Sequence, residues 1–214
     1  MTRNELRVID VRDRETMIPV WFKAVYLAFV AVLVPAYTLE HGLLNFLWFS
    51  NLALMGGLLA ALFESPRLAS MMLVAVALLE MGWIIDFLGS LLLGGTPPLG
   101  FVDYMYDPEI ALFVRLLSLY HLALPFVLFW IVWRLGYDQD AWKVWVVAGT
   151  GILILTFFLS SPDRNVNWVW GPGEPQDLIS PYAWLGIVIA ACAAAWWLTH
   201  RLVRIIMGRF DRVI

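Results

Sequence analysis

Charged residues and cysteine are both scarce in this sequence. Asp, Glu, Lys and Arg together make up 14% of the chain, whereas hydrophobic residues make up 62% and aromatic residues 15%. This balance is far too apolar for a soluble globular domain. The single cysteine, Cys192, excludes a disulfide framework and a cysteine metal site, and its small neighbours indicate a packing role at a close helix contact.

The sequence also lacks a plausible set of metal or haem ligands. Its three histidines, His41, His121 and His200, are expected at the outer surface, near the middle and at the inner edge of a membrane. They are therefore too far apart to share a cofactor. We expect no metal, no other cofactor and no nucleic-acid partner.

A cleavable signal peptide and an internal repeat are missing too. The apolar run that starts at Ile18 is too long for a signal peptide, and no small-residue cleavage pattern follows it, so we expect the first span to be retained. The inverted repeat that marks many transporters is not visible.

Long apolar runs are what the sequence has instead. Six of them have close to the roughly 20 residues that a helix needs to cross a bilayer. Strands would leave open edges in lipid. We therefore predict an all-α integral membrane protein, a single domain over residues 1–214 that forms a six-transmembrane-helix bundle. The predicted spans are 18–38, 42–63, 68–94, 109–134, 141–160 and 181–206.

The 14 lysines and arginines are distributed unevenly over the two sides of this predicted bundle. Arg164 is expected on the outer side and Arg115 within a span. Because Lys and Arg collect on the cytoplasmic side of membrane proteins, both termini are predicted to be cytoplasmic. The other twelve all fall on that side: Arg3, Arg7, Arg12, Arg14, Lys23, Arg67, Arg134, Lys143, Arg201, Arg204, Arg209 and Arg212.

Two long connections, 94–109 and 160–181, are expected on the outer side. They are rich in Gly, Pro, Asp, Asn and aromatic residues, which favours ordered turns over flexible linkers. Residues 1–16 alternate acidic and basic side chains and are predicted to be a cytoplasmic tail or an interfacial helix. Since the cytoplasmic connections are brief, the outer face is the expected working face.

Polar residues recur on one face of three predicted helices. Positions three or four apart share a helical face, so each set forms a polar stripe. Charges in hydrocarbon cost several kcal/mol unless they are paired, so these stripes need partners. The stripes are Asn45, Trp48 and Asn51 in the second span, Glu80, Trp83, Asp86 and Ser90 in the third, and Arg115, Ser118, His121 and Pro125 in the fourth.

Depth in the membrane suggests which groups meet. At about 1.5 Å per residue, Arg115 and Asp86 lie roughly 9 and 12 Å from the outer ends of their spans, and His121 and Glu80 roughly 18 and 21 Å. We therefore expect an Asp86–Arg115 ion pair and a hydrogen bond or shared proton between Glu80 and His121. Pro125 frees the carbonyl group of His121, and a kink there is a common way to open a cavity.

Two interpretations of these contacts remain open: they lock helices together, or they form a functional site. In a functional site, His121 is the candidate general acid or base, and Glu80 tunes it. The nucleophile is left open between Ser118, Ser50 and an activated water. Arg115 and Asn51 are candidates to orient an ester, phosphate or carboxylate group. The full set of candidate substrate-binding residues is Arg115, Asp86, Asn51, Asn45, Trp48 and Trp83.

Several segments resemble known families. GLLNFLWFSNLAL and SLYHLALPFVLFW, together with YMYDP and NVNWVWGPG, resemble an uncharacterised family of small bacterial multi-pass membrane proteins. This resemblance implies the bacterial cytoplasmic (inner) membrane and carries no activity with it.

The first two segments also resemble, more distantly, the androgen-induced and androgen-dependent tissue-factor-pathway-inhibitor-regulating proteins. These are six-helix lipid-ester hydrolases with a threonine on the second span and a histidine on the fourth. The resemblance places the histidine at His121 and the threonine at Trp48, which cannot be a nucleophile. Ser50 has a hydroxyl group but points to another side of the helix.

Three functions remain open from the sequence. One is a lipid-directed hydrolase or transferase with a buried polar site open toward the outer leaflet, where a lipid-like molecule binds or is processed. Another is a proton-coupled carrier. The third is a non-catalytic membrane partner or assembly protein that docks another protein through the outer loops. Whether the protein is an enzyme stays undecided, and membrane lipids surround it in every case.

Overall fold

The computed structural model describes the backbone of residues 17–210 and the side chains of residues 17–208. Every regular element in this part of the chain is helical, so the all-α prediction is confirmed there. The predicted tail, residues 1–16, lies outside the described residues. The elements are α1 Val20–His41, η2 Leu43–Leu47, α2 Phe49–Phe63, α3 Pro66–Leu92, η3 Asp103–Met105, α4 Leu112–Leu117, α5 Tyr120–Leu135, α6 Ala141–Leu159, η4 Val166–Trp168 and α7 Pro181–Phe210.

Five stretches of the described chain are long and apolar enough to cross a membrane. They are α1, α3, α4 together with α5, α6, and α7 as far as Gly208. The predicted span over 42–63 is interrupted instead: Gly42 follows α1 with φ +75°, and Trp48 is extended, with ψ 133°, between η2 and α2. The remaining helix α2 has 15 residues, a rise of about 22 Å, which is less than the thickness of the hydrocarbon core of a bilayer.

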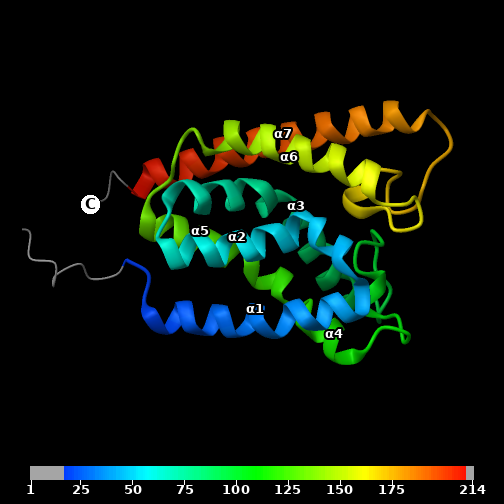
Figure 1. The fold of residues 1–214 in the computed structure, drawn as a ribbon, viewed down its shortest axis with the longest axis horizontal. Coiled ribbons are helices and arrows are strands. Elements are labelled where there is room, and N and C mark those ends of the chain that lie inside the picture. The colour runs from blue at the N-terminus through cyan, green and yellow to red at the C-terminus, as the bar shows by residue number, and fades with distance from the viewer. Residues whose placement is uncertain (1–16, 211–214) are drawn as a thin grey trace, which may run out of the picture.

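Helix α3 is the centre of the bundle and packs against α2, α5, α6 and α7. Figure 1 shows α1 along one side of this arrangement and α6 with α7 along the opposite side. Both ends of the described chain lie at one end of the bundle, which we call the terminal end (Figure 1). The connections 94–111 and 160–180 lie at the opposite end, which we call the loop end.

The contact between α3, α6 and α7 is centred on Trp196, whose side chain is fully buried. Its indole Nε1 donates a hydrogen bond to the carbonyl oxygen of Ala75 on α3, at 3.1 Å. Gly149 on α6 lies against the same ring, and a Cβ atom at this glycine would be 2.5 Å from it. The absence of a side chain at Gly149 therefore sets how closely α6 and α7 approach.

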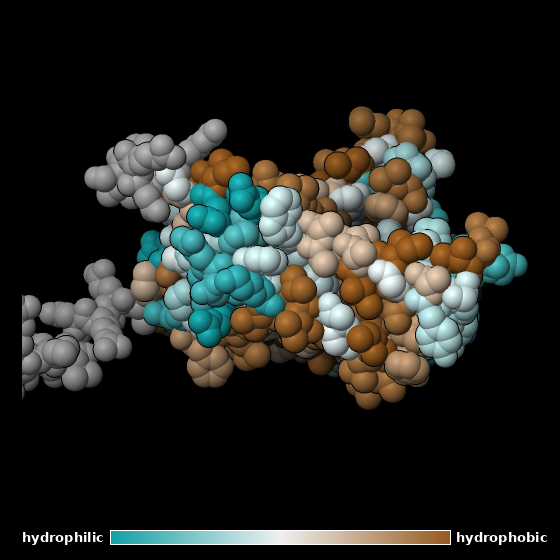
Figure 2. All heavy atoms as spheres, turned by 90° about the horizontal axis from the view of Figure 1, so that it is seen from above, coloured by the Kyte–Doolittle hydropathy of each residue, from teal (hydrophilic) through white to brown (hydrophobic). Residues whose placement is uncertain are grey.

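Large apolar side chains face outward along the helices, as lipid contact requires. Phe63, Leu92 and Val147 are exposed over 77%, 88% and 76% of their surface. Figure 2 shows hydrophobic side chains over much of the α6–α7 face, with hydrophilic ones gathered toward the terminal end. An apolar surface of this extent would aggregate in water and is stable in a bilayer.

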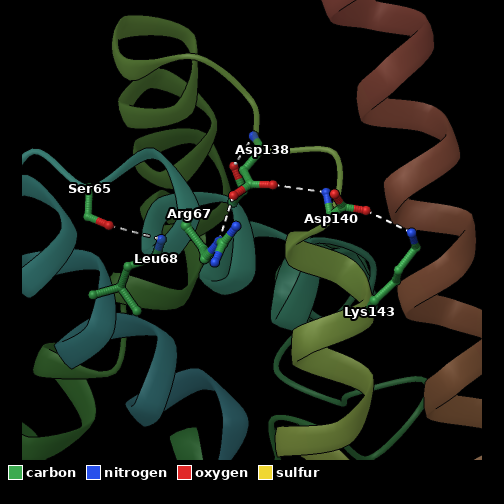
Figure 3. Close-up of polar contacts among 7 residues, drawn as sticks. Ser65, Arg67, Leu68, Asp138, Asp140 and Lys143 are labelled. Atoms are coloured by element: carbon green, nitrogen blue, oxygen red, sulfur yellow. Dashed lines mark hydrogen bonds and ion pairs between the residues drawn. The ribbon is translucent and has the colours of Figure 1, made fainter.

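The terminal end is closed by polar contacts between the start of α3 and the turn before α6 (Figure 3). Arg67 Nε donates to Asp138 Oδ2 at 2.8 Å, and the other carboxylate oxygen of Asp138 accepts the backbone N–H of Asp140. Asp140 in turn binds Lys143. The Ser65 hydroxyl caps the first turn of α3, a position where serine followed by proline is favourable.

Candidate functional site

The predicted contact between Glu80 and His121 is present. Oε2 of Glu80 on α3 lies 2.8 Å from Nδ1 of His121 on α5. Both residues are buried, with 4% and 9% of their surface exposed. A carboxyl group and an imidazole so close together in an apolar bundle satisfy each other's hydrogen-bonding need. The cost of leaving either group unpaired is the reason that this contact was expected from the sequence.

Two aromatic rings stack on the imidazole and fix its plane. The ring of Trp83 lies 4.8 Å from that of His121 with an interplanar angle of 17°, and the ring of Tyr120 lies 4.2 Å away at 25°. The bond at Nδ1 is the only side-chain hydrogen bond that His121 forms with the described residues. The imidazole is thus held by one nitrogen and by two stacked aromatic rings, and its other nitrogen is left without a hydrogen bond in the described part of the chain.

Tyr120 connects this imidazole to α2 through ring stacking and a hydrogen bond. Tyr120, whose ring covers His121, donates its hydroxyl hydrogen to Oδ1 of Asn51 at 2.9 Å. Nδ2 of Asn51 donates to the backbone carbonyl of Asn45 at 2.8 Å. Asn51 thus lies beside α5, and Tyr120 mediates its contact with His121.

Ser118 and Tyr104 complete the buried polar cluster. The Ser118 hydroxyl lies 2.6 Å from the hydroxyl of Tyr37 on α1 and donates to the carbonyl oxygen of Val114 at 3.3 Å. Tyr104, from the connection between α3 and α4, accepts a hydrogen bond from Trp83 Nε1 at 3.1 Å. Burial raises the pKa of the Tyr104 hydroxyl well above its ordinary value. It therefore stays protonated and can act as a hydrogen-bond donor.

The predicted Asp86–Arg115 ion pair is wrong. The carboxylate of Asp86 is fully buried and accepts three backbone N–H groups, from Leu99 at 2.6 Å, Phe101 at 2.7 Å and Val102 at 3.1 Å. Among the described residues it forms no ion pair within 4 Å. The loop folds back into the bundle and offers its own donors, which a helix-by-helix depth count does not take into account.

Arg115 has a different partner from the one expected. Its Nη1 donates to the carbonyl oxygen of Met105 at 3.1 Å, and its buried Nε has no partner in the described part of the chain. Asp86 and Arg115 thus both hold the connection between α3 and α4, Asp86 over residues 99–102 and Arg115 at Met105. These contacts support a loop-fastening role for Asp86 and give no direct evidence of substrate binding.

Two of the predicted stripes are broken by the backbone. The interruption at Trp48 takes Asn45 and Trp48 off the helix that carries Asn51. In the fourth span, bonds to the residue three positions earlier replace the helical pattern around Leu119, so Arg115 on α4 and His121 on α5 belong to separate helices. Pro125 itself lies within the continuous helix α5.

Asn45 and Trp48 lie instead at a second site near the loop end. With His41, Arg164 and Val166 they line an open pocket of about 200 Å³. An apolar groove of about 240 Å³ lies elsewhere, against the lipid-facing side of α2, α3 and α6. Neither of these two hollows is lined by Glu80 or His121.

Tyr37, Tyr104 and Tyr120 are members of the cluster that the sequence analysis missed. Tyr120 had a signal in the sequence, because it directly precedes the only histidine near the middle of a span. Tyr37 and Tyr104 come from α1 and from a loop, and no spacing relates them to the polar stripes. Only the folded chain brings these hydroxyl groups to Ser118 and Trp83.

The cluster brings together side chains of the types that take part in acid–base chemistry. No group of three or more His, Cys, Asp or Glu side chains suited to a metal ion occurs in the described chain. Glu80 and His121 can hold and transfer a proton, and Tyr104, whose hydroxyl hydrogen is not donated to any described residue, can donate a hydrogen bond to a developing negative charge. Comparison with known proteins gives no further guidance, since the chain matches no protein-family model, no curated protein and no solved structure.

Proposed function

We propose that the chain is a multi-pass membrane protein whose Glu80–His121 site binds and processes a lipid-like molecule, with His121 as general base and then general acid. The observation that carries this proposal is the buried pair at 2.8 Å, in which His121 bonds to Glu80 through Nδ1 and Nε2 forms no hydrogen bond with the described residues. A carboxylate that accepts the Nδ1 hydrogen leaves Nε2 as the basic nitrogen and stabilises the imidazolium when it takes a proton.

The serine hydroxyl group in the cluster is already hydrogen-bonded, which favours hydrolysis by an activated water over attack by the serine. Ser118 already donates to a carbonyl oxygen and lies 2.6 Å from Tyr37, so it is not free to attack. In ester hydrolysis, Nε2 would take a proton from water as the water oxygen bonds to the carbonyl carbon. The same proton would then go to the departing alkoxide as the ester C–O bond breaks.

The distant resemblance to the lipid-ester hydrolases supports this proposal at His121 alone. Trp48, which stands where those proteins have threonine, lines the separate pocket near the loop end. We therefore do not extend their covalent mechanism to this chain.

The cation distribution supports a topology with both termini in the cytoplasm of a bacterial cell. Arg67, Lys143, Arg201 and Arg204 come from the helix ends at the terminal end of the bundle, where both ends of the described chain lie (Figure 1). We propose that η2 and α2 together form a broken sixth pass. An even number of passes puts both ends on one side, and the positive-inside rule assigns that side to the cytoplasm.

A non-catalytic docking role is the second candidate. The observation that favours it is that neither hollow at the surface reaches Glu80 or His121, while apolar side chains stand out from the loops. Leu99 and Leu178 are exposed over 53% and 90% of their surface. Such side chains at the loop end suit contact with another membrane protein.

The deciding experiment compares two buried histidines. The full chain is placed in lipid nanodiscs and assayed against a panel of lipid esters, with thermal stability measured in parallel. We expect His121→Ala to lower turnover by about 100-fold or more, and Glu80→Gln to lower it by about tenfold or more. His200→Ala is the matched control, because His200 is also buried but binds Tyr137 at the terminal end.

The same experiment separates the two candidates. Turnover that depends on His121 and not on His200 supports the enzyme. If the wild-type chain turns over no ester, and His121→Ala and His200→Ala lower the melting temperature equally, the pair is structural and the docking role is favoured.

A further inference from the structure

The pocket near the loop end has a polar lining that the Glu80–His121 site does not use. It is open, encloses about 200 Å³ and lies where the end of α1, the η2 segment and the 160–180 connection meet. Its lining residues are His41, Asn45, Trp48, Arg164 and Val166. These contribute a guanidinium, an imidazole and an amide, and no carboxylate.

Arg164 is held in this pocket by the backbone. Its Nη1 donates to the carbonyl oxygen of His41 at 3.1 Å. Gly42 turns the chain away from α1 at φ +75°, a conformation that favours glycine, and this turn directs the carbonyl group of His41 toward Arg164. This bond anchors the exposed guanidinium at one nitrogen, and its other N–H groups form no hydrogen bond with the described residues.

The loop that carries Arg164 is itself well ordered by hydrogen bonds. Asn165, which is buried, donates from Nδ2 to the carbonyl oxygens of Gly171 and Gly173 and accepts the N–H of Trp170. The N–H groups of Arg164 and Asn165 both bond to Ser161. Such a loop holds the cation in place before any ligand arrives, which lowers the entropic cost of binding.

Within the described chain, the positive charge of Arg164 is balanced only by a longer-range electrostatic interaction with the neighbouring carboxylate of Asp163. Among the described residues Arg164 forms no ion pair within 4 Å. Two acidic residues are close in sequence to the pocket residues: Glu40 on α1, next to His41, and Asp163 in the 160–180 connection, next to Arg164. Both are exposed, and neither lines the pocket. The side chains of Asn45 and His41 also have no hydrogen bond of their own within the described chain.

We propose that this pocket binds an anionic phosphate or carboxylate group. The guanidinium of Arg164 forms the charged contact, for which its planar fork is suited, and the amide of Asn45 and the imidazole of His41 add hydrogen bonds. Trp48 contributes an aromatic wall of the kind that lies at the headgroup level of membranes. The anion is either the headgroup of an acidic lipid or a free small anion, and both share this chemistry.

This site is distinct from the proposed acid–base site and does not depend on it. The backbone carbonyl of Asn45 is bonded to Asn51, and Asn51 is bonded to Tyr120, so the two sites are neighbours through the network. The anion contacts come from side chains that Glu80 and His121 do not touch. Failure of the lipid-ester assay would leave this proposal unaffected, and the reverse holds too.

The test uses the full chain in nanodiscs and separates the two sources of the anion. In one arm, the nanodiscs contain only a neutral phosphatidylcholine, and inorganic phosphate or acetate is titrated at constant ionic strength. In the other arm, phosphatidylglycerol is added to the nanodiscs, and the lipids retained on the protein are counted by native mass spectrometry. The variants are Arg164→Gln and Asn45→Ala, and the control is Arg201→Gln, because Arg201 lies on α7 over Trp197, near the terminal end.

We expect Arg164→Gln to weaken binding at least fivefold in one of the two arms, Asn45→Ala to weaken it in the same arm, and Arg201→Gln to have no effect. The arm that responds identifies the source of the anion. Equal binding by wild type and Arg164→Gln in both arms, or no binding by the wild type in either, overturns the proposal. Asn45→Ala leaves the Arg164–His41 contact in place, so it remains informative if Arg164→Gln does not fold.

Discussion

Asn167 bridges the break between η2 and α2. Its Oδ1 accepts the N–H of Phe49 at 3.1 Å, and its Nδ2 donates to the carbonyl oxygen of Leu47 at 2.8 Å. A side chain from the 160–180 connection thus supplies the partners that the chain loses where Trp48 is extended. This contact explains how a segment as apolar as 42–63 can leave the helical conformation within the bundle.

Replacing Asn167 tests that role. Asn167 has φ +53°, so Asn167→Gly removes both hydrogen bonds without straining the backbone, whereas Asn167→Ala adds strain. We expect Asn167→Gly to lower the free energy of unfolding by about 1–3 kcal/mol, because two backbone groups lose their partners. Asn167→Ala should cost more still. A melting temperature that both variants leave unchanged would show that water satisfies the break.

Asp86 should control the order of the connection between α3 and α4. Asp86→Asn replaces a carboxylate that accepts three N–H groups with an amide that brings donors of its own. We expect a loss of about 2–4 kcal/mol in stability, together with faster hydrogen exchange at Leu99, Phe101 and Val102. Asp103→Asn, at an exposed position in the same connection, is the control and should change neither quantity.

Two glycines on α6 offer a matched test of helix packing. A Cβ atom at Gly149 would meet the buried ring of Trp196, whereas a Cβ atom at Gly151 would meet nothing within 4 Å. Gly151→Ala should stabilise the protein by up to about 1 kcal/mol, as expected for alanine in place of glycine in a helix. Gly149→Ala should destabilise it by about 1–3 kcal/mol through overpacking. Thermal unfolding in the same detergent measures both, and a shift of the same sign would contradict the close approach.

Glu64 should make stability depend on pH at the terminal end. The hydrogen bond from Lys23 lowers the pKa of the Glu64 carboxyl below its ordinary 4.5, with a further contribution from the N–H of Ile18. Because the pKa of Glu64 is lower in the folded state than in the unfolded state, the contact of its carboxylate with Lys23 stabilises the fold fully above about pH 4.5. This contribution is lost as the pH falls through the pKa of the folded state.

We therefore expect Glu64→Gln to cost about 1 kcal/mol at neutral pH, and the difference from wild type to shrink below pH 4.5. Melting temperatures between pH 3 and pH 7 check this, with Glu109→Gln at an exposed position as the control. A difference that does not vary with pH would assign the effect to packing instead of charge.

Much of the fold follows from the sequence by itself. Apolar runs of the length of a bilayer predict α1, α3, α6 and α7 close to their observed bounds, because a backbone in lipid has to satisfy its hydrogen bonds within each helix. The Glu80–His121 contact is also predictable, since both groups are ionisable, lie at matched depth on connected helices, and are costly to leave unpaired.

Other features were decided only by the tertiary structure. Asp86 bonds to loop N–H groups instead of Arg115, and Asn45 and Trp48 leave the helix of Asn51, because the two long connections fold back against the bundle. Depth and spacing along a helix describe only groups within regular elements. Loop backbone and the side chains of Asn167 and Tyr104 offer hydrogen bonds of equal strength, and which of them reaches a given group depends on how the chain packs in three dimensions.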